Sequence, residues 1–152
     1  GSGEHASTQA ALRCLHAQWD APASVADVGT GSGILALYAS VRGCPDLQAC
    51  DIELPAVAAA RELLPAARIH LGGPETLAPA DCVIANLTAA ELHAALPAIL
   101  PRWTQQSALV LGGMRSHEVE GILQRVGLPP CHVEVREAFT AFAFRAAAQR
   151  AR

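Results

Sequence analysis

The chain has 152 residues, 51% of them hydrophobic, and a formal net charge of −3. This length and composition are typical of one globular domain with a proper core and exclude a disordered chain. All 11 basic residues are arginine and form no cluster, which argues against nucleic acid as the main partner, and no run is apolar and long enough to span a membrane.

A polar lead, 1–8, opens the chain and is expected to be a loop. It ends in two hydroxyl residues, either of which is a suitable cap for a helix. Leu12, Leu15 and Trp19 then recur at helical spacing and predict one amphipathic helix before the first strand.

The stretch 24–37 predicts a buried strand, a glycine loop and the start of a helix. An apolar run with β-branched residues comes first, and three glycines follow at alternate positions: Gly29, Gly31 and Gly33. Such a loop lets the backbone approach a ligand closely, with amide N–H groups and a helix N-terminus facing it. We therefore expect a nucleotide-like cofactor here, the alternative being a glycine turn without a ligand.

The spacing of the glycines distinguishes between cofactors. A dinucleotide fingerprint requires a third small residue at position 34, where this chain has Ile34. The pattern that is present, Asp27-x-Gly29-x-Gly31-x-Gly33, resembles the first motif of Rossmann-like S-adenosylmethionine (SAM) methyltransferases. The chain has neither a phosphate loop of the G-x-x-x-x-G-K-[ST] type nor a nucleophile elbow at this position.

An acidic residue stands at the end of the next predicted strand, 47–52. Asp51 follows Gly29 at about the 20-residue spacing at which nucleotide-binding units place an acid for the ribose hydroxyls. Carboxylate oxygens accept both hydroxyl hydrogens, so an acid suits this position. If the strand end is shifted, Glu53 is the alternative residue for this role. A second alternative is that Asp51 is an ordinary solvated acid without a ligand.

The remaining elements alternate between helix and strand. We predict helices at 34–42, 56–64, 89–100 with a kink at Pro97, and 116–126 capped by Ser116; strands at 68–71, 81–85 and 108–111; a closing hairpin of 133–136 and 139–145; and a frayed helical tail from 146.

This order indicates an α/β fold with a mostly parallel, doubly wound sheet closed by an antiparallel C-terminal hairpin. We expect a single domain over 1–152, with 1–20 as an N-terminal loop and helix and 24–145 as a Rossmann-like core. Ligands bind such sheets at the carboxyl ends of the strands, where the glycine loop, Asp51 and Asn86 are all expected.

Four segments together resemble the bacterial ribosomal protein L-eleven (L11) methyltransferase family, PrmA type. The lead GSGEHAST is similar to the family's G-T-G-x-H-x-T-T loop, and VADVGTGSGILA to its cofactor loop. CDIE and VIANLTA are similar to its D-I-D and V-x-A-N-I-L-A stretches. The likeness covers nearly the whole chain and implies a class I SAM-dependent methyltransferase. Family members carry an N-terminal substrate-recognition domain, which we expect to be absent here.

The resemblance also implies roles for individual residues. Asn86 would lie beside the methyl group and the incoming amine, as the catalytic residue, and Thr8, with His5, would close over the cofactor. The residues expected to bind the cofactor are His5, Thr8, Asp27, Gly29, Thr30, Gly31, Gly33, Asp51, Ile52 and Asn86.

The expected function is SAM-dependent N-methylation of a protein amine, with a lysine or the N-terminal amine of ribosomal protein L-eleven as the family-level acceptor. The alternatives are a SAM-dependent enzyme for a small amine, a non-catalytic SAM-binding fragment and, more distantly, a nicotinamide dehydrogenase. No nucleic acid or membrane partner is expected.

Five scattered cysteines without a C-x-x-C pair indicate reduced thiols and hence a cytoplasmic location. The six histidines show no metal-ligand spacing, so no metal is expected.

Overall fold

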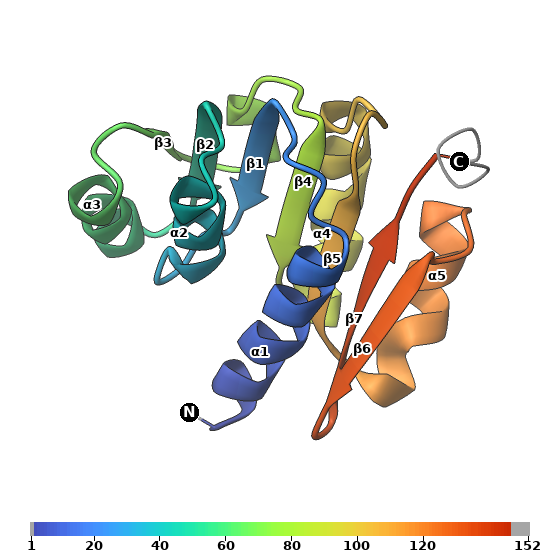
Figure 1. The fold of residues 1–152 in the computed structure, drawn as a ribbon. Helices are drawn as coiled ribbons and strands as arrows, with labels where there is room; N and C mark the ends of the chain where they lie inside the picture. The colour runs from blue at the N-terminus through green and yellow to red at the C-terminus, as the bar shows by residue number, and fades with distance from the viewer. Residues whose placement is uncertain (1, 147–152) are drawn as a thin grey trace.

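The computed structural model describes residues 2–146, with side chains from His5 onward, and a mixed sheet runs through its centre (Figure 1). Within the described residues, seven strands lie in the order β3-β2-β1-β4-β5-β7-β6. Their bounds are β1 Ser24–Val28, β2 Asp46–Asp51, β3 Arg68–Leu71, β4 Cys82–Asn86, β5 Leu109–Arg115, β6 His132–Arg136 and β7 Phe139–Phe144. Strands β1 to β5 are parallel, whereas β7 is antiparallel to β5 and β6. The predicted fold class is therefore confirmed.

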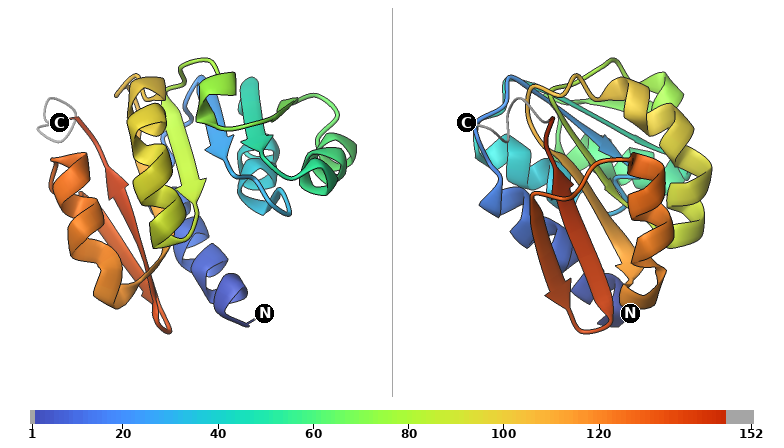
Figure 2. Two further views of the ribbon diagram at one scale, coloured as in Figure 1. Left: turned by 180° about the vertical axis from the view of Figure 1, so that it is seen from behind. Right: turned by 90° about the vertical axis from the view of Figure 1, so that its right-hand side faces the viewer.

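Helices cover both faces of the sheet (Figure 2). Those in the described part of the chain are α1 Ser2–Ala17, α2 Ile34–Val41, α3 Leu54–Leu63, α4 Ala89–Ile99 and α5 Val119–Val126, with short 3-10 turns η1 Pro74–Thr76, η2 Leu100–Arg102 and η3 Ser116–Glu118. Helices α1 and α2 share one apolar cluster with the sheet, α3 packs on β2 and β3, and α4 and α5 share a second cluster on the opposite face. Because the helices pack on the two faces, the edge of the sheet formed by the carboxyl ends of β1, β2, β4 and β5 is left open.

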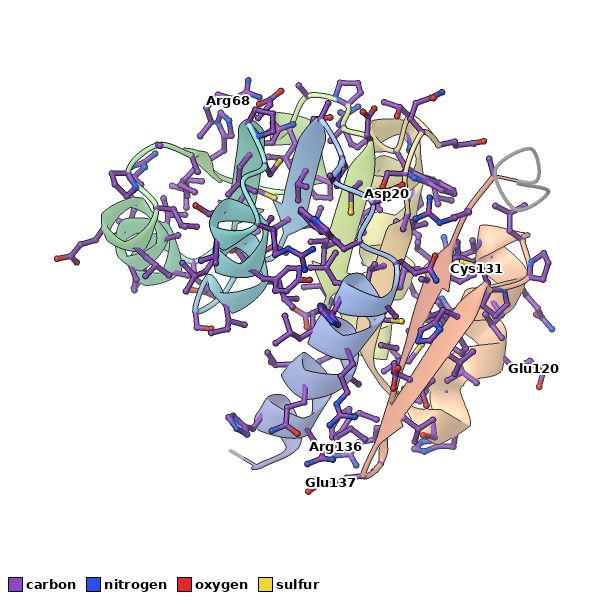
Figure 3. The ribbon with its side chains drawn as sticks, in the orientation of Figure 1. Asp20, Arg68, Glu120, Cys131, Arg136 and Glu137 are labelled. Carbon is purple, nitrogen blue, oxygen red and sulfur yellow. The ribbon has the colours of Figure 1, made fainter. Side chains whose placement is uncertain are left out.

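The prediction of a loop over 1–8 is wrong for residues 2–8, because α1 begins at Ser2, and residue 1 lies outside the described residues. Ala6 and Ser7 are only 3% and 6% exposed, so even the early turns of this helix are packed. The helix runs beside β5, β6 and β7, and Arg136, at the tip of the β6–β7 hairpin, donates from Nε to Oε1 of Gln9 at 2.7 Å (Figure 3). Tertiary burial thus outweighs the poor helix propensity of a segment rich in glycine, serine and threonine.

Helix α4 continues through Pro97 and begins with a capping box. Thr88 Oγ1 accepts the Glu91 N–H at 3.2 Å, and Glu91 Oε1 accepts the Thr88 N–H at 3.0 Å. Pro97 has no N–H for the carbonyl of His93, one turn earlier, and the guanidinium of Arg125 donates to that carbonyl instead. This contact joins α4 to α5.

Strand β5 is longer than predicted, since it passes through Gly112 and Gly113 and ends at Arg115. Its pairing with β7 shifts register between Leu111 and Met114, and Gly113 has a φ of +92° within the irregularity. Two consecutive glycines predict a turn, but here they form a bulge, which bends the strand without ending it.

The predicted cap at Ser116 is also wrong. Its Oγ lies 2.8 Å from Thr140 Oγ1 and donates to the carbonyl of Ala138, while η3 intervenes before α5. Ser116 therefore joins the end of β5 to the start of β7. The predicted helical tail begins at Ala146, which is not helical; the rest of it, 147–152, lies outside the described residues.

Candidate active site

The glycine loop after β1 is held by the end of β2. Gly29 and Thr30 both donate their N–H to the carbonyl of Cys50, at 2.9 and 3.0 Å, and Gly31 donates to Oδ2 of Asp51 at 2.9 Å. Gly29, Gly31 and Gly33 have φ values of +69°, +53° and +82°. A side chain at these positions would strain the backbone, so the loop requires the three glycines that the sequence supplies.

Asp51, not Glu53, is the acid that the fold places against this loop. Its side chain is buried, and Oδ1 accepts the N–H of Glu53 at 2.9 Å while Oδ2 accepts that of Gly31. Each carboxylate oxygen has a further lone pair. Asp51 therefore fixes the loop and still has capacity to accept a hydroxyl hydrogen from a ligand.

A cavity of about 430 Å³ opens beside the loop, at the carboxyl ends of β1, β4 and β5. It is lined by Ser7, Thr8, Gly29, Thr30, Gly31, Ser32, Ile34, Leu35, Asn86, Leu87, Thr88, Glu91, Gly113, Arg115 and Phe139. Five of the predicted site residues are among these: Thr8, Gly29, Thr30, Gly31 and Asn86. The other five predicted residues do not line this cavity. His5 is exposed on α1, and Asp27 and Gly33 are buried at either side of the loop. Asp51 and Ile52 lie at the end of β2.

Asn86 carries the most distinctive feature of the cavity. Its side-chain oxygen Oδ1 is buried and, among the described residues, has no hydrogen-bond partner. Its Nδ2 donates to Thr8 Oγ1 at 3.5 Å, a contact that connects β4 to α1. Buried polar atoms are rarely left unpaired, because an orphaned acceptor costs about 1–3 kcal/mol. The Oδ1 atom is therefore suited to accept a hydrogen from a bound ligand.

The wall beyond Asn86 was missed by sequence reasoning. Gly113 lies directly against the backbone of Leu87, and Arg115 stacks on Phe139 with Cζ 5.2 Å from the ring centroid. Only the register of β5 and β7 brings these residues together, so no local pattern reveals them. The capping box of α4 did have a readable signal, Thr88-x-x-Glu91.

Asp27 lies beneath the loop and binds it through Thr30, whose Oγ1 donates to Oδ2 at 2.8 Å. Burial raises the pKa of Asp27 from the ordinary value of 3.8 to about 7. Between about pH 4 and pH 7 the native chain therefore holds a proton that the unfolded chain has released. The stability that this proton contributes is lost as the pH rises through that window.

We therefore expect Asp27→Asn, which does not titrate, to gain stability relative to the wild type as the pH rises. Within the window the gain is about 1.4 kcal/mol for each pH unit. Urea unfolding at pH 5 and pH 6 measures it. Asp46→Asn is the control, because Asp46 is half exposed and pairs with Arg68 on the surface. A constant difference between Asp27→Asn and the wild type at both pH values contradicts the prediction.

The described residues contain no group of three or more histidine, cysteine or acidic side chains placed to hold a metal ion. A search of the same residues finds no helix with the length and hydrophobicity to cross a membrane. The five cysteines are free thiols, and burial raises the pKa of the Cys50 thiol to about 11. Burial likewise raises the pKa of the Cys14, Cys44 and Cys82 thiols, and a thiol with a raised pKa is a poor nucleophile near neutral pH.

The sheet order differs from the 3-2-1-4-5-6 order of dinucleotide-binding folds by the antiparallel strand inserted beside β5. With the glycine loop and the acid after β2, this sheet order defines the Rossmann-like fold of class I SAM-dependent methyltransferases.

A ribosomal protein L11 methylase structure from Lactobacillus delbrueckii subsp. bulgaricus has this fold. Its TM-score is 0.84, with 23% identity over 91% of this chain and 78% of that one. A SAM-bound amino pentose methyltransferase of Micromonospora echinaspora matches with a TM-score of 0.53 and 28% identity over 73% and 50% of the two chains.

Residues 1–144 match the family model described as ribosomal protein L11 methyltransferase (PrmA), and the chain belongs to that family. The ribosomal protein L11 methyltransferase of Thiobacillus denitrificans is 34% identical over 127 residues, which cover 81% of this chain and 43% of the relative. That of Wolinella succinogenes is 32% identical over 133 residues, covering 84% and 48%. The predicted resemblance and the SAM-dependent class are thus confirmed at the level of the family. The chain spans less than half the length of these relatives.

Proposed function

We propose that this chain binds SAM and catalyses transfer of its methyl group to an amine of a protein, with a ribosomal protein as the candidate acceptor. The side chain of Asn86 carries the proposal, because it lines the cavity that adjoins the glycine loop and its buried Oδ1 has no partner among the described residues. It supplies an acceptor for an amine hydrogen beside the place where a cofactor would lie. Family membership supports the reaction, and a lysine side chain or an N-terminal amine is the group we infer to be methylated.

The residues around the loop fit the cofactor. A Cβ added to Gly31 meets no atom within 4 Å, so the backbone at this point borders open space into which a ligand fits. Asp51 would accept the ribose hydroxyls through its remaining lone pairs. Ile52 follows Asp51 in the chain and is 71% exposed, and Leu71 pairs with Asp51 across the sheet and is 52% exposed. Together these two side chains give an apolar surface for a flat base.

The predicted residues outside the cavity take supporting roles in this proposal. Asp27 holds Thr30 and so shapes the loop from below, and Gly33 turns the chain into α2. His5 and Thr8 lie on α1, and Thr8 reaches the cavity directly. We keep these assignments as predictions for the ligand-bound protein.

SAM would supply an electrophilic methyl group on a sulfonium sulfur. The protein's part is to place a neutral amine in line with that group. Asn86 Oδ1 would accept one amine hydrogen and so direct the nitrogen lone pair, and the proton released after transfer would pass to water. Glu91 is the single carboxylate among the cavity-lining residues, and its Oε1 is already bound to the Thr88 N–H, so we assign no general base.

Calorimetry with SAM and with NAD tests the first half of the proposal: SAM is expected to bind and NAD is not. Transfer of a labelled methyl group to ribosomal proteins and to a panel of small amines tests the second. Absence of SAM binding overturns the proposal, and transfer only to small amines replaces the protein acceptor by a small one.

With five free thiols and a weakly acidic charge, we further infer a cytoplasmic protein that does not act on nucleic acid.

Asn86→Ala is expected to slow methyl transfer up to about tenfold, since one neutral hydrogen bond contributes about 0.5–1.5 kcal/mol. Asn86→Asp retains an acceptor oxygen and is the conservative comparison. Single-turnover rates at saturating SAM measure the effect. Equal rates for the alanine variant and the wild type show that Oδ1 does not orient the acceptor.

A further inference from the structure

The cavity has two ends with different chemistry. The glycine loop forms one end, and the residues beyond Asn86 form the other. This second end contains the two charged side chains that line the cavity, Glu91 on α4 and Arg115 on β5, together with the ring of Phe139 on β7. If the glycine-loop end holds the cofactor, as proposed above, the second end faces the methyl acceptor.

Arg115 is available to a ligand. Its Cζ lies 5.2 Å from the centroid of the Phe139 ring, and a guanidinium held by a ring face in this way can still donate through its N–H groups. Among the described residues the guanidinium has no carboxylate partner. The nearby Glu118 accepts the backbone N–H of Arg115 at 2.8 Å and forms no ion pair with the side chain.

The sheet register places a second arginine on the same face. Phe139 of β7 pairs with Arg115 on one side and with Arg136 of β6 on the other, so the three side chains form a row across three strands. Arg136 uses its Nε to bind Gln9, which leaves its terminal nitrogens available. The acids nearby are Glu118 and Glu137, and Glu137 follows Arg136 in the exposed hairpin turn. With Glu91 these make three acids around the two arginines, so the positive charge at this end is confined to the row that Arg115 and Arg136 form with Phe139.

The register also sets the distance to the reacting group. Gly112 pairs with Asn86, and Arg115 lies three residues farther along β5. At about 3.3 Å per residue, and less across the bulge at Gly113, Arg115 lies within roughly 10 Å of Gly112, the partner of Asn86, along the strand. Both residues line the same cavity, so one small molecule or one short peptide segment can contact both.

We propose that Arg115, supported by Phe139, is a specificity-determining residue that binds an anionic group of the methyl acceptor. The acceptor is then an amine that carries a carboxylate within roughly 10 Å of the methylated nitrogen. In a protein this is a lysine or terminal amine next to an acidic side chain, and in a small molecule it is an amino acid. Glu91, which lines the same cavity, supplies negative charge that suits the amine end of such a dipolar group. This inference rests on the proposed function.

The test compares acceptors that differ only in charge. Nα-acetyl-lysine and Nα-acetyl-lysinamide have the same amine, and only the first has a carboxylate. The dipeptides Lys-Glu and Lys-Gln with blocked ends form the second pair. We expect the kcat/KM of the wild type to be three- to tenfold higher for the anionic member of each pair. This ratio is modest because the Arg115 guanidinium is exposed, although it is stacked on a ring. The preference is expected to shrink at 0.5 M salt.

Arg115→Gln is expected to bring the preference to about one, and Arg115→Glu to reverse it, which a purely structural role does not predict. Arg42→Gln is the matched control, because Arg42 also stacks on aromatic rings, those of Trp19 and Tyr38, but lies outside the cavity. A preference in the peptides identifies an acidic side chain as the anion, and a preference confined to Nα-acetyl-lysine identifies a small-molecule carboxylate.

A binding measurement separates this inference from the proposed function. Titration of the protein with Nα-acetyl-lysine or its amide, followed by NMR of the Phe139 ring without SAM, requires no activity. Tighter binding of the carboxylate that is lost in Arg115→Gln supports the inference even if no methyl is transferred. Equal binding of the two compounds, or a preference that survives Arg115→Gln, overturns it, whereas failure to bind SAM overturns only the proposed reaction.

Discussion

Replacing Gly113 with alanine is expected to destabilise the protein by about 3 kcal/mol or more. An added Cβ would lie 2.1 Å from the carbonyl oxygen of Leu87 and 2.7 and 2.8 Å from its C and N atoms, so backbone rather than a flexible side chain would have to move. The φ of +92° adds strain for any residue with a side chain. Urea unfolding gives the loss directly, and because Leu87 lines the cavity, SAM affinity is expected to fall as well.

Gly127→Ala is the matched control for this steric argument. Gly127 ends α5 with a φ of +76°, and a Cβ there meets no atom within 4 Å. It shares the backbone strain of Gly113 but not the collision, so we expect a loss of about 1 kcal/mol. Equal losses for the two variants show that the contact with Leu87 relaxes freely and contradict the prediction.

Asp51→Ala is expected to weaken SAM binding by about 10- to 100-fold, in line with 1.5–3 kcal/mol for hydrogen bonds to a charged group. The variant loses the acceptor for the Gly31 N–H, which shapes the loop, as well as the carboxylate proposed to bind the ribose. Calorimetric titration with SAM measures the change. The free energy of unfolding is measured in parallel, because two buried or part-buried N–H groups lose their partner.

Two variants make this result specific. Glu53→Gln is expected to leave SAM affinity within about twofold, since the exposed Glu53 contributes its backbone N–H to Asp51 and not its carboxylate to the loop. Asp46→Asn removes an acid from the opposite end of β2, where it pairs with Arg68. A larger loss for Glu53→Gln than for Asp51→Ala reassigns the ribose contact to Glu53.

The parts of the fold that follow from local pattern were predictable. The passage from β1 through the glycine loop to α2 depends on neighbouring residues, and the β6–β7 hairpin depends on alternation around a short turn. The position of Asp51 followed from the regular spacing of a βαβ unit. These predictions needed no knowledge of distant contacts, and the strands, helices and hairpin are confirmed.

The parts that depend on contacts between distant segments were not predictable. The helix begins before Ala6 and Ser7, which are buried against elements that include strands much later in the chain, and Thr8 approaches Asn86 across a separation of 78 residues. Two glycines at the end of β5 look like a turn until β7 pairs across them. The stacking of Arg115 on Phe139 likewise exists only in the assembled sheet.

The packing of α1 against the last strands has a consequence for the order in which the protein matures. During synthesis residues 2–17 emerge well before β5, β7 and β6, against which this helix is buried. The cavity draws Thr8 from the first helix and Phe139 from the last strand, so neither a nascent chain nor a fragment that ends before β7 has a complete site. The proposed methyl transfer is therefore expected to report on completed folding, whereas the glycine loop and β2 are translated much earlier.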